Sequence, residues 1–405
     1  MTDSPAENQA SPVALWRAGA GLALVLGLLA GLRLPSIWSA THALFDYHEG
    51  FIKRGLFGEF LSLVFGHQLS YWTFALVSYL IFILWLSLLL RRLRTLGETD
   101  PWIWIAGAVF FLSPGFVFLV HEIGYFDHLG LLCLLVCFLL PADLRGCLAR
   151  IVLCTAMVLT HEAFFLMFFP VLLFQFYLRA TLRQEPRALL LTVVLALAVA
   201  AVTYLVGQAA LPPGGEAAMA AYLQERAADF RIRSDAVGIL FRDGGDNLRN
   251  QFRIWIRVQD RALYAAVGVL VLLPLPVLFL RLATGMLRRA PGRRRLMAFG
   301  AAAAAAAPLS LNVVASDMWR FFALAQITAF LVFLAVRAET GAPVVQPGRA
   351  ARTGYLLATV AVLGALSGLP LFDGHVPARP PFVETIGEIS RALRAGEPLL
   401  LMPTR

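Results

Sequence analysis

The stretch Leu44-Phe45-Asp46-Tyr47-His48-Glu49-Gly50-Phe51-Ile52-Lys53-Arg54-Gly55 follows the first long apolar segment and concentrates two acids, a histidine, a lysine and an arginine. If Asp46 to Arg54 form a helix, Asp46, Glu49 and Lys53 lie three and four residues apart and share one face. Apolar residues then recur at helical spacing, at Ile52, Leu56, Phe60, Leu63 and Val64. We therefore predict a helix over 44–66 that lies along a membrane surface, at the acidic mouth of a multi-spanning protein.

The composition around this stretch is that of an integral membrane protein. Of 405 residues, 59% are hydrophobic and only 15% are charged, and the mean hydropathy is +0.74. The net charge of +9 comes mainly from arginines in short clusters between apolar runs, so it indicates loops that set orientation and no nucleic-acid partner. The cysteines lie in or beside apolar segments, and we predict no disulfide.

Apolar runs of spanning length predict an all-α polytopic fold with about eleven transmembrane helices. The candidate spans are 14–34, 70–90, 101–120, 128–142, 149–163, 164–180, 188–209, 262–282, 296–315, 321–337 and 353–370. The first run also resembles a secretory signal, but the many apolar segments after it favour a retained span. We expect one membrane domain over 1–370 and a short extracytoplasmic tail over 371–405.

Basic loops predict the orientation of these spans. With eleven spans, all of the arginine clusters fall on one side of the membrane, and the positive-inside bias makes that side cytoplasmic. The clusters are Arg91 to Arg94, Arg145 to Arg150, Arg179 to Arg187, Arg281 to Arg295 and Arg337 to Arg352. This places the N-terminus inside and the C-terminus outside, in what we expect to be a bacterial inner membrane.

The same topology brings four polar motifs to the outer helix ends. They are Asp46 to Glu49, His121 to His128, His161-Glu162 and Asp317 to Arg320. Because ionisable groups at membrane depth are costly and usually functional, four of them at one level predict a shared outer cavity.

A longer outer loop, 210–261, contains a predicted helix near 217–230 and then a basic stripe. Arg249, Arg253 and Arg257 recur every four residues beside apolar side chains. This pattern is typical of a helix at a membrane interface, where it can hold lipid phosphate or act as a plain anchor.

Three His-Glu dipeptides raise the question of a metal. They are His48-Glu49, His121-Glu122 and His161-Glu162. Imidazole and carboxylate are ordinary ligands of divalent ions, so His48, His121 and His161 could together bind one. Adjacent helical residues point about 100° apart, so each dipeptide offers one ligand at most. We therefore assign no firm metal site and no certain cofactor.

Three motifs resemble those of the GT-C class of polytopic membrane glycosyltransferases, which use polyprenyl-phosphate-linked sugars at the outer face. The motifs are Asp46-Tyr47-His48-Glu49, then Leu112-Ser113-Pro114-Gly115 with Gly124-Tyr125-Phe126-Asp127-His128, and Thr160-His161-Glu162. The likeness covers roughly residues 14–180. Two features depart from the class: the acidic pair is spaced Asp-x-x-Glu, and no large C-terminal soluble domain follows.

This resemblance implies an inverting transfer of a sugar from the lipid-linked donor to a glycan or lipid acceptor. Asp46 or Glu49 is expected to act as the general base. Contacts to substrate and phosphate are expected from His48, Lys53, Arg54, Glu122, Asp127, His161, Glu162, Asp317 and Arg320. Two other functions stay open: a transporter or flippase of a lipid-linked saccharide, and a polysaccharide polymerase or ligase with a diphosphate-linked donor.

Overall fold

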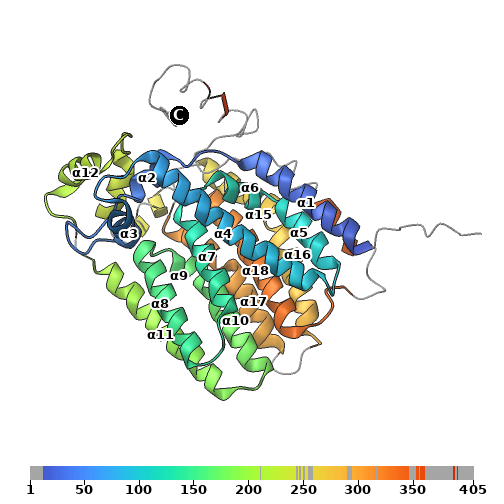
Figure 1. Ribbon diagram of the computed structural model, residues 1–405. Coiled ribbons are helices and arrows are strands. Elements are labelled where there is room, and N and C mark those ends of the chain that lie inside the picture. Colours follow the sequence, from blue (N-terminus) through green and yellow to red (C-terminus); the bar gives the residue numbers. More distant parts are fainter. Residues whose placement is uncertain are drawn as a thin grey trace, which may run out of the picture.

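A computed structural model describes residues 12–209, 211–242, 259–289, 294–315 and 317–345, with a few residues between 245 and 253 and between 353 and 390. All elements in these ranges are helices, and an isolated bridge between Leu69 and Ala227 is the one β-type pairing among them. Figure 1 shows the helices side by side in one bundle.

Five helices of the described chain are long and apolar enough to cross a membrane. They are α1 (Pro12–Gly31), α4 (Tyr71–Gly97), α11 (Pro186–Gly207), α17 (Arg294–Ala306) continued by the 3-10 helix η2 (Ala307–Val313), and α18 (Met318–Thr340). Two bent pairs raise the number to seven if each is one span: α5 (Trp102–Phe111) with α6 (Pro114–His121), and α15 (Gln259–Leu272) with α16 (Pro274–Leu287). The prediction of an all-α membrane protein is confirmed.

The predicted count of eleven spans is not confirmed. Helices do form at the expected places in α7 (Phe126–Leu139), α8 (Leu144–Thr160) and α10 (Phe169–Leu182), but they have only 14, 17 and 14 residues. A span needs about 20 residues, so these helices are short for a full crossing. The last predicted span, 353–370, and the tail 371–405 lie largely outside the described residues.

Helix α18 is the buried centre of the bundle. Nearly all of its side chains are shielded, and it packs against α6, α10, α16 and α17. Aromatic rings fill the contacts around it, with Phe330 of α18 stacked on Phe110 of α5 at 4.2 Å between ring centroids. Because α18 is held on all sides, a charged residue at its first turn has a fixed position.

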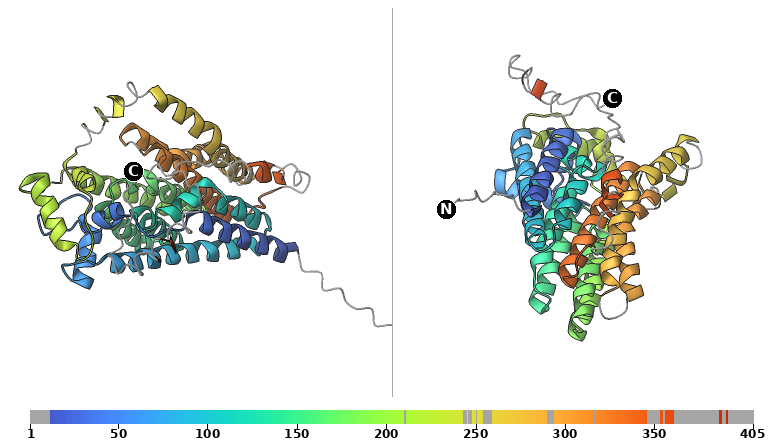
Figure 2. Two further views of the ribbon diagram at one scale, coloured as in Figure 1. Left: turned by 90° about the horizontal axis from the view of Figure 1, so that it is seen from above. Right: turned by 90° about the vertical axis from the view of Figure 1, so that its right-hand side faces the viewer.

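The two ends of the bundle differ in character. Helices α2 (Ile37–His42), α3 (Gly55–Phe65) and α12 (Gly215–Arg226) gather at one end, as Figures 1 and 2 show. At the opposite end, Arg337 donates to Thr99 at 2.9 Å and Arg179 pairs with Glu339 at 2.8 Å. The end with α2, α3 and α12 carries the acidic and histidine motifs, and we call it the acidic end.

The expected helix over Asp46 to Arg54 is wrong: this segment is a loop. Its backbone enters the left-handed region at Gly50 (φ 104°) and again at Arg54 (φ 64°), which no continuous right-handed helix allows. The helical part of the predicted surface helix is α3 alone. Gly58 of α3 lies so close to the backbone oxygen of Phe45 that a Cβ would not fit, which fixes the loop against the helix. Helix α3 exposes Phe60, Leu63 and other apolar side chains, as expected at a membrane surface.

Gln326 of α18 joins the two bent helix pairs. Its side-chain Oε1 accepts from the backbone N–H of Gly115, beside the 56° bend between α5 and α6. Its Nε2 donates to the carbonyl of Leu272, at the 44° bend between α15 and α16. Gln326 therefore satisfies two backbone groups that the bends leave without helical partners.

Replacing Gln326 with Leu should lower the free energy of unfolding by about 2–4 kcal/mol, because it leaves two buried backbone groups unsatisfied. Unfolding in mixed detergent micelles measures the change. Gln208→Leu, at an exposed position, is the matched control and should stay within about 0.5 kcal/mol of the wild type. A cost equal to that of the control would show that the bends do not depend on Gln326.

Candidate functional site

The acidic end contains a buried charged cluster built around Arg320, in the first turn of α18. Its guanidinium donates to both oxygens of Asp127, at 3.0 Å and 2.6 Å. Asp127 stands in the first turn of α7, where the helix dipole also favours a negative charge. Asp317, the residue just before α18, has its Oδ2 3.6 Å from Nη1 of Arg320, and the guanidinium lies over the ring of Tyr125 at 4.3 Å from the ring centroid. The arginine is thus held by charge and by a π-face.

A second arginine joins the cluster from the loop before α3. Arg54 forms a bidentate pair with Glu162, with its Nη2 2.6 Å from Oε1 and its Nε 3.0 Å from Oε2. His161 links the two arginines, because its Nε2 lies 3.3 Å from Nη2 of Arg320 and its Nδ1 lies 3.6 Å from Glu162. Glu162 and His161 follow α8 directly, at the break before α9 (Phe164–Met167). We call Arg54, Asp127, His161, Glu162, Asp317 and Arg320 the arginine cluster.

Burial and the arginines shift the pKa values of the groups outside the helices. Burial raises the pKa of Glu162, but Arg54 outweighs it and holds the pKa well below the usual range. Burial, assisted by Arg54, lowers the pKa of His161 to about 4. Near neutral pH, Glu162 is therefore charged and His161 is neutral, as partners of two permanent cations.

His42, the last residue of α2, is a member of this site that the sequence did not point to. Its ring is fully buried, and neither ring nitrogen has a hydrogen-bond partner among the described residues. Four aromatic rings surround it, with centroids between 5.0 and 6.1 Å away: Trp38, Phe45, Tyr125 and Phe126. Burial, with Arg54 next in importance, keeps its pKa well below 6.5, so the imidazole is neutral.

Asp46 lies in a neighbouring cluster with a different cation. Its carboxylate pairs with Arg226 of α12 at 2.5 Å and accepts from the hydroxyl of Tyr222 at 2.9 Å. Both charged side chains are almost fully buried. Arg226 also donates to the carbonyls of Leu44 and His67, so it ties the loop to α12. We call Asp46, Tyr222 and Arg226 the tyrosine cluster.

The other loop residues lie at the surface of the tyrosine cluster. Glu49 is half-exposed, and its charge adds to the burial and to Asp46 in raising the pKa of Tyr222. His48 is exposed and stacks on Tyr222, with centroids 5.7 Å apart. Lys53 donates to the carbonyl of Arg242 at 3.1 Å. These side chains face solvent and are accessible to a ligand from outside.

Glu122, one of the residues expected to contact the substrate, lies outside the arginine cluster. It lies 3.6 Å from Arg33, which follows α1 and also donates to the carbonyl of His121 at 3.0 Å. This contact joins the end of α1 to the end of α6, at the same end of the bundle. Of the residues predicted to bind substrate, six lie in the arginine cluster, and His48, Lys53 and Glu122 lie in other contacts.

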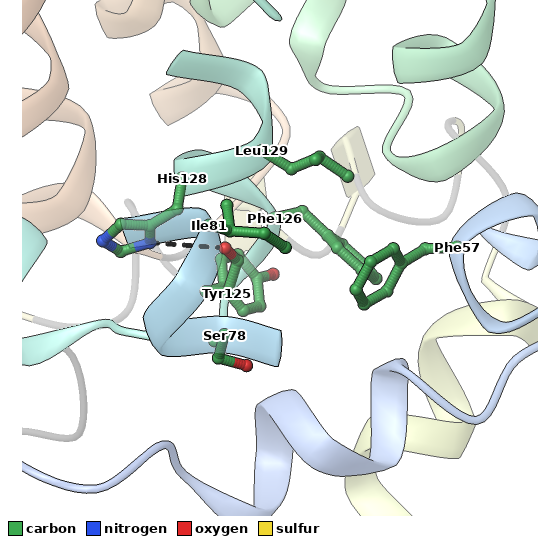
Figure 3. Close-up of a pocket in the computed structure, with 8 residues that line it drawn as sticks. Phe57, Ser78, Ile81, Tyr125, Phe126, His128 and Leu129 are labelled. Carbon is green, nitrogen blue, oxygen red and sulfur yellow. Dashed lines mark hydrogen bonds between the residues drawn. The ribbon is translucent and has the colours of Figure 1, made fainter. Parts of the chain in front are cut away.

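A small apolar pocket adjoins the arginine cluster. Phe57, Ile81, Phe126 and Leu129 line it together with Ser78, Gly124, Tyr125 and His128. Figure 3 shows these side chains around the pocket, with His128 turned back toward the carbonyl of Tyr125. Tyr125 and Phe126 form part of its wall and also pack against His42 and His161. An apolar pocket and a charged cluster therefore share two aromatic rings.

The structure gathers no metal-ligand set within its described ranges: no three histidine, cysteine or acidic side chains meet at metal-binding distance there. His48 stacks on Tyr222 and His161 contacts Arg320, so two of the three candidate ligands belong to different clusters. The basic stripe is described only in part. Arg249 and Arg253 are exposed, and Arg257 lies outside the described residues, so its lipid-phosphate role stays a prediction.

Sequence reasoning missed His42, Tyr222 and Arg226. Arg226 lies at the end of the helix predicted near 217–230, which the structure confirms as α12. Its one signal was its position as an arginine within a helix predicted in an outer segment. His42 gave a comparable signal, as a lone histidine just before the acidic loop.

The neutral histidines predict a pH dependence of stability. Because their folded pKa values lie below the unfolded value of about 6.5, protons bind the unfolded chain first as the pH falls. The free energy of unfolding should therefore drop between pH 6.5 and 5, above the range where most carboxylates titrate. His42→Phe should reduce this slope, whereas the exposed control His67→Phe should keep it. Equal slopes in all three proteins would contradict the burial of a neutral His42.

Comparison of the chain with protein-family models, with curated proteins and with solved structures finds no match.

Proposed function

We propose that the chain is a membrane glycosyltransferase that moves a sugar from a polyprenyl-phosphate donor to a glycan or lipid acceptor, with inversion. The reaction takes place at the acidic end, which we assign to the extracytoplasmic face of a bacterial inner membrane, with the N-terminus cytoplasmic and the C-terminus outside. The observation that carries the proposal is the meeting of Arg54 and Arg320 with three acids and His161 at this end.

In the proposed step, a carboxylate takes the proton of an acceptor hydroxyl, and the hydroxyl oxygen attacks the anomeric carbon. The bond from that carbon to the phosphate oxygen breaks, and polyprenyl phosphate leaves with the bonding electrons. Arg54 and Arg320, with Lys53 nearer the surface, stabilise the negative charge on the leaving phosphate.

The geometry favours Glu49 over Asp46 as the base. Asp46 is buried and neutralised by Arg226, and its oxygens already accept from Tyr222 and from the backbone N–H of His48. These contacts and its burial keep an acceptor hydroxyl away from the Asp46 oxygens. Glu49 is half-exposed at the surface of the same cluster, where an acceptor sugar can reach it.

The surroundings support a lipid-linked donor. Helix α3 exposes Phe60, Leu63, Val64 and Phe65, and Arg54 of the arginine cluster directly precedes this helix. A lipid phosphate needs this combination, because its head group is charged and its tail is not.

The test is the release of lipid phosphate by purified protein in nanodiscs. Polyprenyl-phosphate sugars, with an acceptor glycan, should yield free polyprenyl phosphate, and Glu49→Gln should reduce the rate by about 100-fold or more at unchanged stability. The matched control Glu98→Gln, in the exposed pair with Arg94 at the opposite end, should keep the full rate.

Release of diphosphate would point to the polymerase or ligase. Movement of an intact lipid-linked saccharide across proteoliposomes, without release, would point to the flippase. A chelator added to the assay tests a divalent-ion requirement.

A further inference from the structure

His42 presents a chemical problem that the folded chain does not solve. A neutral imidazole has one N–H donor and one nitrogen acceptor, and at this buried position both are unsatisfied. Leaving such groups without partners costs free energy, and a native protein seldom does so without a functional reason. The described residues around it supply no partner: Trp38, Phe45, Tyr125 and Phe126 meet the imidazole through ring contacts, the Trp38 Nε1–H also lacks a hydrogen-bond partner among them, and the Tyr125 hydroxyl accepts from Arg320.

The charges that act on His42 belong to the arginine cluster. Arg54, Arg320, His161 and Glu162 all lie near enough to influence its protonation. His42 and His161 both pack against Tyr125 and Phe126, so the two imidazoles share a wall with the arginines. A group that satisfies His42 must therefore fit beside Arg54 and Arg320, whose guanidinium N–H groups are paired with Glu162 and Asp127 and are the usual partners of an oxyanion.

We propose that His42 donates its imidazole N–H to the phosphate of the lipid-linked donor, in a site that it forms with Arg54 and Arg320. The inference rests on the proposed function and adds a binding residue to it. His42 is neutral here, so it gives a hydrogen bond to the phosphate without adding a further charge.

Glu162 pairs with Arg54 at the position that the proposal gives to the phosphate. It holds Arg54 through a bidentate pair, and its side chain is 34% exposed, whereas those of Asp127 and Arg320 are 0% and 5% exposed. Glu162 is thus the acidic partner that can move, while Asp127 keeps Arg320 oriented. Binding of a phosphate displaces the Glu162 carboxylate from Arg54, so Glu162 competes with the ligand.

The experiment measures binding of polyprenyl phosphate to the full chain in detergent by native mass spectrometry, together with thermal stability. His42→Phe keeps the aromatic packing and removes the two unsatisfied nitrogens. It should raise the melting temperature of the empty protein and weaken phosphate binding by about 10- to 100-fold, the range expected for a hydrogen bond to a charged group. His42→Gln, which retains an N–H donor, should recover part of the affinity.

Glu162→Gln should have the opposite effect to His42→Phe. It removes the charge that competes for Arg54 and should tighten phosphate binding several-fold. The control His67→Phe should change neither quantity. Unchanged affinity in His42→Phe, or weaker binding in Glu162→Gln, would overturn the site. Binding that depends on His42 without release of lipid phosphate from a sugar donor would overturn the transfer reaction and leave the phosphate site. Release of lipid phosphate that does not depend on His42 would overturn the phosphate site and leave the transfer reaction.

Discussion

Replacing Arg320 with Met should lower the free energy of unfolding by about 3–5 kcal/mol and abolish sugar transfer. The variant leaves Asp127 fully buried at the start of α7 without its bidentate cation, and an uncompensated buried charge is among the costliest changes in a protein. Asp317 and the face of Tyr125 also lose their cationic partner. Unfolding in mixed detergent micelles, with activity measured per folded molecule, separates the two effects.

Two variants sharpen this result. Arg320→Met combined with Asp127→Leu removes the pair as a whole and should recover most of the lost stability, but none of the activity. Arg94→Met breaks an exposed pair with Glu98 at the opposite end and should cost no more than about 0.5 kcal/mol. If the single Arg320 variant costs as little as the Arg94 control, the cluster is not the buried ion pair that the structure describes.

Asp46→Asn should cost about 3 kcal/mol, the second largest effect that we expect. It leaves Arg226, which is 1% exposed, with only neutral oxygens as partners. The loop before α3 then loses its charged link to α12, so activity falls together with the fraction of folded protein. The loss should be recovered in part by Asp46→Asn with Arg226→Gln, because that pair leaves no buried charge.

Glu49→Gln is the comparison that separates structure from chemistry in the same loop. It changes a half-exposed side chain and should keep stability within about 0.5 kcal/mol. We expect it to lose transfer activity nonetheless. If Asp46→Asn loses activity at unchanged stability and Glu49→Gln keeps it, Asp46 is the base and Glu49 is not.

Local patterns were enough to predict the helical membrane fold, but not the lengths of its helices. The apolar runs at 128–142 and 164–180 do become helices. The first helix ends at Leu139, shortly before Pro141, and the second run is interrupted at Phe168, just before Pro170. The loop over Asp46 to Arg54 failed as a helix for a different reason. Its side chains have helical spacing, but the contacts of Arg54 with Glu162 and of Arg226 with Leu44 select the loop.

The sequence predicted which residues lie at the same end of the bundle, because the order of the helices decides this. Asp127, Glu162 and Arg320 were expected at one level because their motifs fall at outer helix ends, and the contacts of Arg320 with Asp127 and with His161, next to Glu162, now join that level directly. The pairing among them was beyond the sequence. Nothing in the spacing of Asp46 indicates Arg226 as its partner, because the two meet only when the outer loop folds back onto the start of α4.

The most direct test of the account is an experimental structure of the full chain in nanodiscs with polyprenyl phosphate bound. The account predicts phosphate density between Arg54 and Arg320, within hydrogen-bond distance of His42, with the Glu162 carboxylate turned away and the lipid tail beside α3. Phosphate density at the opposite end of the bundle, or an arginine cluster that keeps its Arg54–Glu162 pair with lipid bound elsewhere, would contradict it.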